Sequence, residues 1–192
     1  MITKEEIRNF IREERAKLRK EWVKENSRCV QERLAALSEF KKAKRVCCYN
    51  ALPGEVETDF IVAMCWTDGK DVCVPAFRKG MNQYGLAELR KGMKMEPGHF
   101  GVAEPVDLEW VFGESVDIFV VPGLAFDSSG GRVGHGGGYY DMILRGMEKK
   151  VFKAGLAFDY QILERIPMLA GDVGMDVVIT EKRVFSSAGS AI

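Results

Sequence analysis

Short apolar runs of strand type alternate with helical segments along this chain, and this alternation restricts the fold more than any other feature. Residues 46–49 and 72–75 are continuous apolar runs, and the helical pattern of Phe60, Ile61 and Met64 lies between them, behind a predicted Thr58 cap. Strands that are apolar on both faces are typical of a parallel sheet, and the helix between them supplies the crossover connection. We therefore expect a β-α-β unit in an α/β fold.

The rest of the chain continues the same alternation. Residues 116–121 form the clearest buried-strand pattern, residues 84–89, 153–158 and 176–180 also read as strands, and a helix is expected over residues 139–145. We find no internal repeat and no Pro/Ser-rich linker in these 192 residues. The sequence predicts one three-layer α/β/α domain over residues 1–192 with a mostly parallel sheet, whose ligands bind at the carboxyl ends of the strands.

The N-terminal segment is predicted to be helical. Thr3 followed by Glu6 is a capping-box pattern that starts a helix. The apolar positions expected on one face of this helix are Ile7, Phe10, Ile11 and Leu18. A second helix is expected with Val30, Leu34 and Leu37 on one face.

The charge pattern restricts the partners of the protein. The whole chain has 28 basic and 28 acidic residues, but residues 1–45 hold 14 Lys/Arg against 8 Asp/Glu and so carry a net charge of +6. Such a basic start could bind RNA, a membrane surface or a polyanionic small molecule, or could be a solvated helix face. Interspersed glutamates dilute any phosphate-tracking stripe, so we expect no nucleic-acid partner. No apolar stretch approaches the ~20 residues that span a bilayer, and the N-terminus is charged where a signal peptide turns apolar, so we expect a cytoplasmic protein without membrane contact.

The cysteines do not indicate a disulfide framework or a zinc site. There are five of them, Cys29, Cys47, Cys48, Cys65 and Cys73, an odd number without a CxxC pair. We expect reduced, mostly buried, small apolar residues.

A glycine-rich segment carries the strongest chemical signal. Six of the 20 glycines fall between Gly130 and Gly138, and Tyr139, Tyr140 and Asp141 follow directly. Glycines between a strand and a helix let backbone N–H groups approach an anion, the helix N-terminus favours negative charge, and Arg132 offers a bidentate fork. This combination predicts a phosphate-binding loop, although a glycine cluster can also be only a flexible surface loop. It is not a Walker loop, because no Lys-Ser/Thr follows the glycines.

The residues after the glycines have two interpretations each. Asp141 could complement the dipole of the helix that starts here, or could hold Mg²⁺ beside a phosphate. Tyr139 and Tyr140 could be core aromatics or could stack on an adenine or pterin ring. The residues themselves leave these alternatives open.

The segment from Val121 to Asp127, followed by Gly130 to Asp141, closely resembles the signature of the 5-formyltetrahydrofolate cyclo-ligase family, also called methenyltetrahydrofolate synthetase. The resemblance spans nearly the whole chain. It implies a cytoplasmic, monomeric ligase of folate and one-carbon metabolism. Such an enzyme uses ATP as co-substrate, with Mg²⁺, to convert 5-formyltetrahydrofolate into 5,10-methenyltetrahydrofolate, ADP and phosphate.

The resemblance also assigns roles to individual residues. It implies that Arg132 and Tyr140 are catalytic and that Asp141 and Asp172 are associated with the metal ion. The implied nucleotide-binding residues are Lys4, Arg8, Arg132, Val133, Gly134, His135, Gly136, Gly137, Gly138, Tyr139 and Tyr140. The implied substrate-binding residues are Asn50, Glu55, Phe100, His135, Gly136, Gly137, Gly138 and Tyr139.

The chain departs from the family pattern at three positions. It has Gly137 where many relatives have Lys, His135 where they have Arg or Tyr, and Met142 where they have Arg. The missing loop cation leaves more of the phosphate charge to Arg132, Lys4, Arg8 and Mg²⁺.

Two other functions fit the same residues. One is an α/β enzyme that isomerises or hydrolyses a sugar phosphate or acyl compound without ATP, which would need a general base in the pocket. The other is a non-catalytic nucleotide binder or an RNA-binding module, the latter with steep salt dependence.

Overall fold

The fold is described from a computed structural model of the chain, which describes residues 2–147 and 151–187. Its largest sheet has eight strands in the described residues, in the order β13-β12-β10-β7-β1-β2-β3-β6. Its central strands are mutually parallel: β12 (Val177–Ile179), β10 (Phe152–Leu156), β7 (Ile118–Val121), β1 (Arg45–Cys47) and β2 (Asp71–Arg78). Antiparallel strands close both edges: β13 (Val184–Ser186) at one, and β3 (Gln83–Glu88) and β6 (Trp110–Val111) at the other. The predicted α/β fold with a mostly parallel sheet is confirmed.

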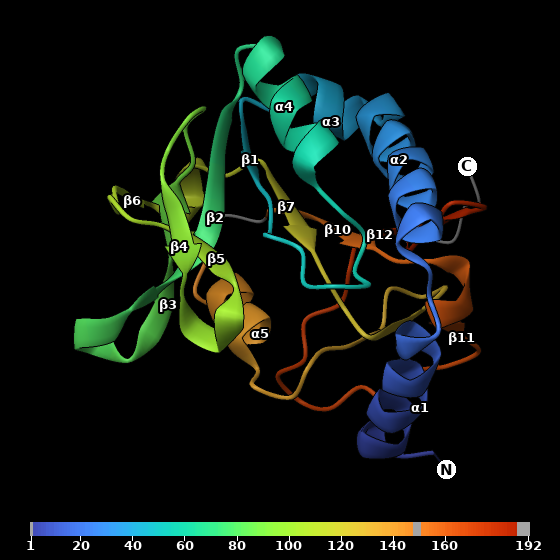
Figure 1. Cartoon of the computed structure of the whole chain (residues 1–192). Helices are drawn as coiled ribbons and strands as arrows, with labels where there is room; N and C mark the ends of the chain where they lie inside the picture. The colour runs from blue at the N-terminus through green and yellow to red at the C-terminus, as the bar shows by residue number, and fades with distance from the viewer. Residues whose placement is uncertain (1, 148–150, 188–192) are drawn as a thin grey trace.

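Helices cover both faces of this sheet, but unequally (Figure 1). The helices α2 (Lys20–Ala36), α3 (Ser38–Lys42) and α4 (Asp59–Thr67) cover one face, whereas the short helix α5 (Tyr139–Arg145) lies on the other. The side chains of β7 alternate accordingly, because Ile118 and Val120 pack under α2–α4 and Phe119 and Val121 face the α5 side. The sparsely covered α5 side leaves room for a cavity.

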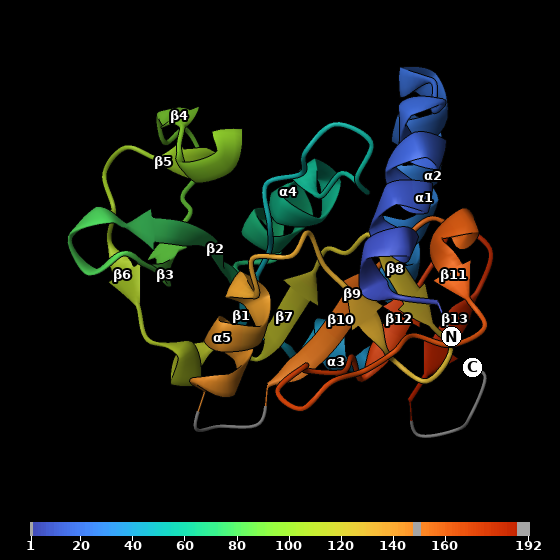
Figure 2. The same ribbon diagram turned by 90° about the horizontal axis from the view of Figure 1, so that it is seen from below.

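The N-terminal helix α1 (Lys4–Ala16) belongs to a separate small layer. Ile7 and Ile11 are fully buried against Leu124, Ala125 and Val133, which lie in or beside a second sheet. This sheet has the strand order β11 (Ile162–Leu163), β8 (Ala125–Asp127) and β9 (Arg132–Val133). Figure 2 shows α1 standing beside β8 and β9, at the side of the molecule away from β3 and β6. Helix α1 is thereby fixed next to the strand that begins with Arg132.

The predicted start of α1 is confirmed. Two of the four residues that we expected on its buried face, Phe10 and Leu18, are not part of that face. Thr3 is the N-cap and forms the capping box with Glu6. Phe10 is 51% exposed, and Leu18 lies beyond the end of the helix at Ala16. The buried stripe is narrow because α1 packs on a small sheet and not on the main core.

The connection between β1 and α4 differs in one detail from the sequence prediction. Thr58 occupies the N-cap position of α4, as predicted, but its side chain makes no capping hydrogen bond. Its Oγ1 donates to the carbonyl oxygen of Tyr49 at 2.6 Å, so it ties the helix start to the end of β1. Cys47, Cys48, Cys65 and Cys73 are buried in this region, as predicted, while Cys29 is partly exposed.

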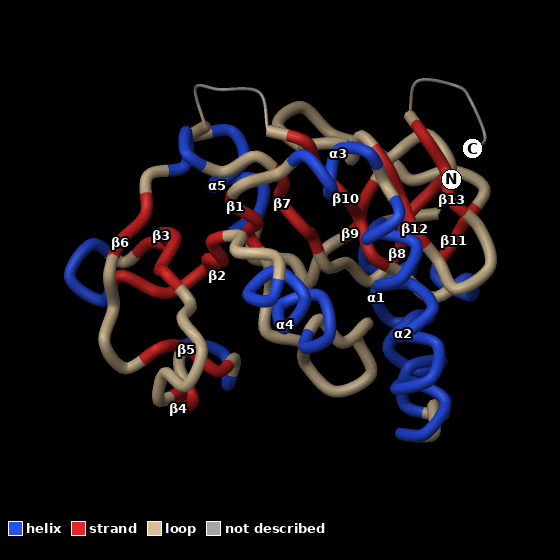
Figure 3. Tube along the Cα trace, turned by 90° about the horizontal axis from the view of Figure 1, so that it is seen from above, coloured by secondary structure: helices blue, strands red, loops and turns tan. Residues whose placement is uncertain are grey.

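The remaining elements are short. The hairpin of β4 (Met95–Pro97) and β5 (Ala103–Pro105) stands apart from the main sheet beyond β2 and β3, as seen from above in Figure 3. Four 3₁₀ helices complete the described chain: Lys79–Met81, His99–Gly101, Gly113–Ser115 and Asp159–Gln161. No helix in residues 2–147 and 151–187 is both long and apolar enough to cross a bilayer.

Candidate functional site

A cavity of about 640 Å³ opens at the carboxyl ends of β1 and β7, between α1, α5 and the segment around Phe100. Its position agrees with the predicted location of ligands in a parallel α/β sheet. The cavity lining combines the backbone of a glycine loop, three basic side chains (Lys4, Arg8 and Arg132), three acidic side chains (Glu55, Asp141 and Asp172), and aromatic rings. This volume suits a small-molecule ligand.

Nearly all residues implied by the family resemblance line this one cavity. They come from five separate segments of the chain: Lys4, Arg8, Asn50, Glu55, Phe100, Arg132, Gly134, His135, Gly136, Gly137, Gly138, Tyr139, Tyr140, Asp141 and Asp172. Val133 is the exception. Its side chain is fully buried beneath α1 because it pairs with Ala125 in the small sheet.

The glycine loop is held against α1. Gly136 and Gly138 have positive φ angles of 114° and 66°, a conformation that residues with a Cβ rarely adopt. Gly138 is the N-cap of α5, and the Arg8 Nε donates to the carbonyl oxygen of Gly134 at 3.0 Å. The backbone of the loop therefore runs along the cavity from the buried Arg132 to the start of α5.

Arg132 is more deeply buried than the other basic residues that line the cavity, Lys4 and Arg8. Its side chain is 4% exposed, its Nη2 donates to the Asp141 Oδ2 at 2.8 Å, and its Nη1 donates to the Pro122 carbonyl oxygen at 3.3 Å. The other oxygen of Asp141, Oδ1, accepts the Val173 N–H at 3.0 Å. A guanidinium group fixed in this way presents its charge to the cavity in one orientation.

Lys4 and Asp172, which lie near opposite ends of the sequence, form a second ion pair in the cavity. The Lys4 Nζ donates to the Asp172 Oδ2, which also accepts the Leu169 N–H at 2.6 Å. Partial burial by itself raises the pKa of Asp172, but the hydrogen bonds from Lys4 and Leu169 and the positive charge nearby outweigh it and lower that pKa. The pair ties the start of α1 to the loop after Leu169.

The two aspartates fit the needs of Mg²⁺ only in part. Asp141 and Asp172 both line the cavity, and Mg²⁺ in nucleotide sites uses one or two carboxylates while phosphates and water supply the other ligands. Over residues 2–147 and 151–187, no group of three or more His, Cys, Asp or Glu side chains could hold a metal ion by itself. The donor set therefore fits a metal ion that arrives with a phosphate ligand.

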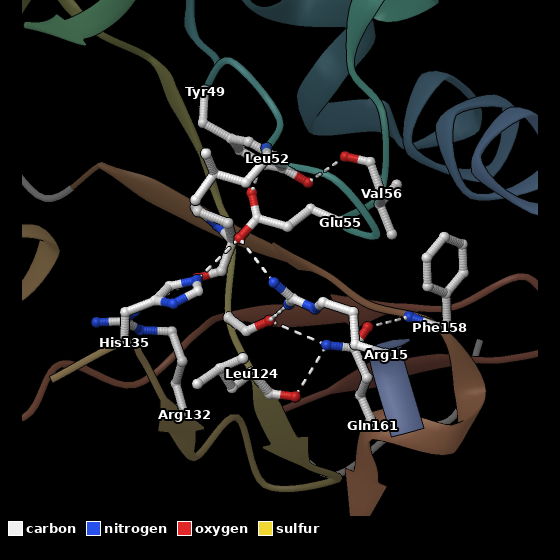
Figure 4. A network of polar contacts seen from close by, with 12 residues as sticks. Arg15, Tyr49, Leu52, Glu55, Val56, Leu124, Arg132, His135, Phe158 and Gln161 are labelled. Carbon is white, nitrogen blue, oxygen red and sulfur yellow. Dashed lines mark hydrogen bonds and ion pairs between the residues drawn. The ribbon is translucent and has the colours of Figure 1, made fainter. Parts of the chain in front are cut away.

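Glu55, in the loop after β1, is a nearly buried carboxylate that is 5% exposed. Figure 4 shows it between His135 and Arg15. Its Oε1 lies 3.0 Å from the His135 Nε2 and 3.6 Å from the Arg15 Nη1, and its Oε2 accepts the Leu52 N–H at 3.0 Å. The ring of His135 is 45% exposed, so it sits at the solvent side of this cluster. The glycine loop and the loop after β1 meet at this contact.

Aromatic rings form another wall of the cavity, where Tyr84, Phe100 and Tyr139 belong to the lining. Tyr139 lies 4.8 Å from Tyr84 and 5.6 Å from Phe100 between ring centroids, and His99 stacks between Phe77 and Phe100 at 4.0 Å from each. Phe100 has a left-handed φ of 58° and is 66% exposed. A bulky residue held in that conformation, with its ring toward a cavity, is typical of a ligand contact.

Tyr139 and Tyr140 both line the cavity but take different positions in it. Tyr139 belongs to the aromatic wall, whereas the next residue of α5, Tyr140, packs on Phe119, with its ring 5.7 Å from the guanidinium carbon of Arg132. Burial, with a further contribution from Glu55, raises the pKa of Tyr140 well above its ordinary value. Tyr140 is thus a neutral phenol on the floor of the cavity.

Sequence reasoning did not identify several lining or supporting residues: Arg15, Tyr49, Leu52, Tyr84, Pro122 and Leu169. A signal for Arg15 existed. It follows Lys4 by eleven residues, which is close to three helical turns, so both lie on the same side of α1. Tyr84 lies on β3, next to the edge strand β6, and nothing in its local sequence distinguishes it from a surface tyrosine.

The arrangement can bind an anionic group and a planar ring side by side. Cations and glycine N–H groups stand at one end of the cavity, and aromatic rings stand at the other. Such a site suits a reaction between a phosphate donor and a ring-containing substrate, in which positioning and charge stabilisation supply most of the catalysis.

Comparisons with known proteins agree with this geometry. The model of the 5-formyltetrahydrofolate cyclo-ligase family matches residues 1–181. A Haemophilus influenzae protein named 5-formyltetrahydrofolate cyclo-ligase is 31% identical, over 92% of this chain and 97% of its own length. A probable 5-formyltetrahydrofolate cyclo-ligase of Caenorhabditis elegans is 30% identical, over 93% of this chain and 92% of its own length.

Solved structures are similar as well. The NMR structure of Aquifex aeolicus 5,10-methenyltetrahydrofolate synthetase superposes with a TM-score of 0.85 and 34% identity, covering 100% of this chain and 96% of the other. A 5,10-methenyltetrahydrofolate synthetase from Mycoplasma pneumoniae has the same fold, with a TM-score of 0.76 at 19% identity.

Proposed function

The chain belongs to the 5-formyltetrahydrofolate cyclo-ligase family, and we propose that the cavity beside α1 is where it carries out the ATP-dependent reaction of that family. In this reaction 5-formyltetrahydrofolate and ATP give 5,10-methenyltetrahydrofolate, ADP and phosphate. The observation that supports the location best is that the cationic glycine-loop end and the aromatic wall share one cavity.

The chemistry explains why both ends are needed. A formamide oxygen is a poor leaving group, so it first attacks the γ-phosphorus of ATP, and ADP departs. The 10-nitrogen of the same folate then attacks the activated formyl carbon, loses its proton, and phosphate leaves. Because nucleophile and electrophile belong to one molecule, the protein must mainly align the two substrates and stabilise the transferred charge.

We assign the nucleotide phosphates to the charged end. Lys4, Arg8 and the glycine-loop backbone surround the space next to Arg132, whose fixed guanidinium can face the charge that develops on the transferred phosphoryl group. The buried phenol of Tyr140 lies beside it as a hydrogen-bond donor.

We assign the folate to the aromatic end. Phe100 and Tyr139 offer ring faces to the pterin or the aminobenzoyl group, and the carboxylate of Glu55 can accept hydrogen bonds from pterin N–H groups. Asn50, which donates to the Ala103 carbonyl oxygen at 2.6 Å, fixes the segment behind Phe100 to the loop after β1. His135 joins the two ends through its contact with Glu55.

Mg²⁺ is part of the proposal. Asp141 and Asp172 would hold it together with the phosphates, where it would neutralise charge on the triphosphate. Each carboxylate now contacts a cation, Arg132 and Lys4 respectively, so both can exchange a partner when the nucleotide arrives.

We further propose that residues 1–192 form one domain that acts as a cytoplasmic monomer without a nucleic-acid or membrane partner. The substrates are small and polar, and the residues assigned to them line one cavity. Size-exclusion chromatography with light scattering tests the monomer directly.

The activity is tested with purified protein and 5-formyltetrahydrofolate, with and without MgATP, by the absorbance of the methenyl product. We expect product only with MgATP, one phosphate released for each ring closed, and loss of turnover when a chelator removes Mg²⁺. Turnover without nucleotide would favour a hydrolase or isomerase, and MgATP binding without product would favour a non-catalytic binder.

A further inference from the structure

We propose that Arg15, which none of the motifs includes, is a positioning residue that holds Glu55 as a carboxylate aimed into the folate end of the cavity. The inference rests on the proposed function, because that function assigns Glu55 to the folate. Arg15 comes from the last turn of α1, far in sequence from every other contact of Glu55.

Both terminal nitrogens of the Arg15 guanidinium group have a polar contact (Figure 4). Its side chain is 12% exposed, its Nη1 lies 3.6 Å from the Glu55 Oε1, and its Nη2 donates to the Gly123 carbonyl oxygen at 3.5 Å. The same carbonyl oxygen accepts the Gln161 Nε2 at 2.9 Å. Arg15 therefore links α1 and the end of β7 to the wall that carries Glu55.

The turn before Glu55 is shaped around the aliphatic part of Arg15. Gly54 has a φ of 78°, and a Cβ at this position would stand 2.6 Å from the Arg15 Cγ. The missing side chain at Gly54 thus lets the turn rest directly on the arginine. The location of the turn, and with it the location of Glu55, depends on Arg15 as well as on the ion pair.

Of the two basic residues that contact Glu55, Arg15 and His135, we expect Arg15 to stabilise the carboxylate more strongly. Glu55 is 5% exposed, and a buried carboxylate without a cation is strongly destabilised. A guanidinium stays charged at every working pH, so Arg15 supplies Glu55 with a permanent positive charge. His135 is also 45% exposed on the glycine loop, while Arg15 is enclosed.

Two buried phenols, Tyr49 and Tyr140, also lie near Glu55. Burial raises the pKa of Tyr49 well above its ordinary value, Glu55 adds to this rise, and Arg15 opposes it. Burial and Glu55 act in the same direction on the pKa of Tyr140. Both phenols are therefore neutral near pH 7 and cannot replace the positive charge of Arg15.

The test compares Arg15→Gln with Arg12→Gln, a matched change on the same helix. Arg12 is 47% exposed and contacts only Glu5 and Asn9 among the described residues. We expect Arg15→Gln to raise the KM for 5-formyltetrahydrofolate about tenfold or more, the effect of losing a charge-assisted contact. The KM for ATP should change by less than about threefold, and Arg12→Gln should change neither.

The conservative variant separates positioning from a general loss of structure. Arg15→Lys keeps the positive charge beside Glu55 and should restore part of the folate KM that Arg15→Gln loses. Parallel rises of both KM values in Arg15→Gln, or no change in the folate KM, would overturn the proposal.

A further measurement keeps the inference separate from the proposed function. If the wild-type protein makes no methenyl product, the proposed function fails, and the link between Arg15 and Glu55 is read from denaturant unfolding of Arg15→Gln, Glu55→Gln and the double variant. We expect the double variant to lose clearly less stability than the sum of the two single losses. Additive losses would show that Arg15 does not hold Glu55.

Discussion

The two ends of the cavity differ in the contacts that a ligand must displace in order to bind. At the charged end, Arg132 is 4% exposed and Lys4 17% exposed, and both are already paired with carboxylates of the protein. At the aromatic end, Phe100 is 66% exposed, and its ring has no polar partner to give up. A ligand must therefore exchange partners at the charged end, whereas it only covers apolar surface at the aromatic end.

The two ends also differ in how the chain assembles them. The Lys4–Asp172 pair joins residues 168 positions apart, and α1 brings Lys4 and Arg8 to the loop only because Ile7 and Ile11 are buried under it. The aromatic wall draws Phe77, Tyr84, His99 and Phe100 from one stretch of the chain, and adds Tyr139 to them. The charged end should therefore depend more strongly on the global stability of the fold.

Arg132→Ala gives the largest expected effect, at the charged end. Loss of a preorganised cation at the transferred phosphoryl group should lower kcat/KM for ATP by about 10² to 10³. The change also leaves Asp141 without its buried partner, and breaking such a pair costs about 3–5 kcal/mol of unfolding free energy. Steady-state kinetics and denaturant unfolding measure the two losses, and an intact ATP dependence would contradict the assignment.

Arg132→Lys sharpens this test, because it keeps the positive charge but not the planar fork that reaches Asp141 and Pro122 together. We expect it to recover stability more than turnover. Equal recovery of both would show that charge alone matters at this position.

Phe100→Ala tests the aromatic end and should raise the KM for the folate about tenfold, in line with the loss of one ring contact of about 1–1.5 kcal/mol. The KM for ATP should stay unchanged, as should the unfolding free energy within about 0.5 kcal/mol, because the ring is exposed. Phe100→Gly should bind the folate as weakly as Phe100→Ala and be slightly more stable, since glycine relieves the left-handed backbone. A change in ATP affinity would contradict the division into two ends.

Acid should weaken the charged end first. Because the folded-state pKa of Asp172 is lowered, its ion pair with Lys4 stabilises the protein above the pKa of an unfolded aspartate, and this contribution is lost as pH falls through the folded-state value. Asp172→Asn should therefore flatten the fall of stability at acidic pH, and this is measured by thermal unfolding across that range. An unchanged slope would show that the pair does not contribute.

Alkali should act at the aromatic end, where burial raises the pKa of Tyr84 to about 12, with Glu104 and Tyr139 adding to the rise. A phenol whose pKa is raised stabilises the fold below pH 10, and this contribution is lost as pH rises toward 12. Tyr84→Phe should reduce this alkaline loss without altering the acidic one.

Cys29→Ser gives the smallest expected effect, none within error on either KM. Cys29 is partly exposed on α2 and does not line the cavity. Any loss comparable to that of Arg132→Ala would count against the location of the site.

Much of the fold could be predicted because its helices and strands follow from patterns of residues that are close together in the sequence. The β1-α4-β2 unit, the β7 and β12 strands and the span of α5 follow from apolar runs and glycines near their ends. Thr58 is the N-cap residue of α4, as predicted, but its hydroxyl accepts no capping hydrogen bond and donates to the Tyr49 carbonyl oxygen. Only the tertiary packing of that loop determines which acceptor is near.

The glycine loop was predictable as a chemical site because its residue types are unusual and adjacent. The sequence could not show that Tyr139 turns to the aromatic wall while Tyr140 turns to the core, or that Val133 faces away from the cavity. Such orientations depend on the register of β9 and on the direction in which α5 leaves the loop.

The sequence by itself determined the α/β class, the capped N-terminal helix and the glycine-rich connection that ends at α5, since each depends on residues a few positions apart. The tertiary structure decided which charges meet: Lys4 with Asp172, Arg132 with Asp141, and Arg15 with Glu55. The reason is physical, because a buried charge is stable only beside its partner, and for residues distant in sequence the packing of helices and sheets decides which partner is within reach.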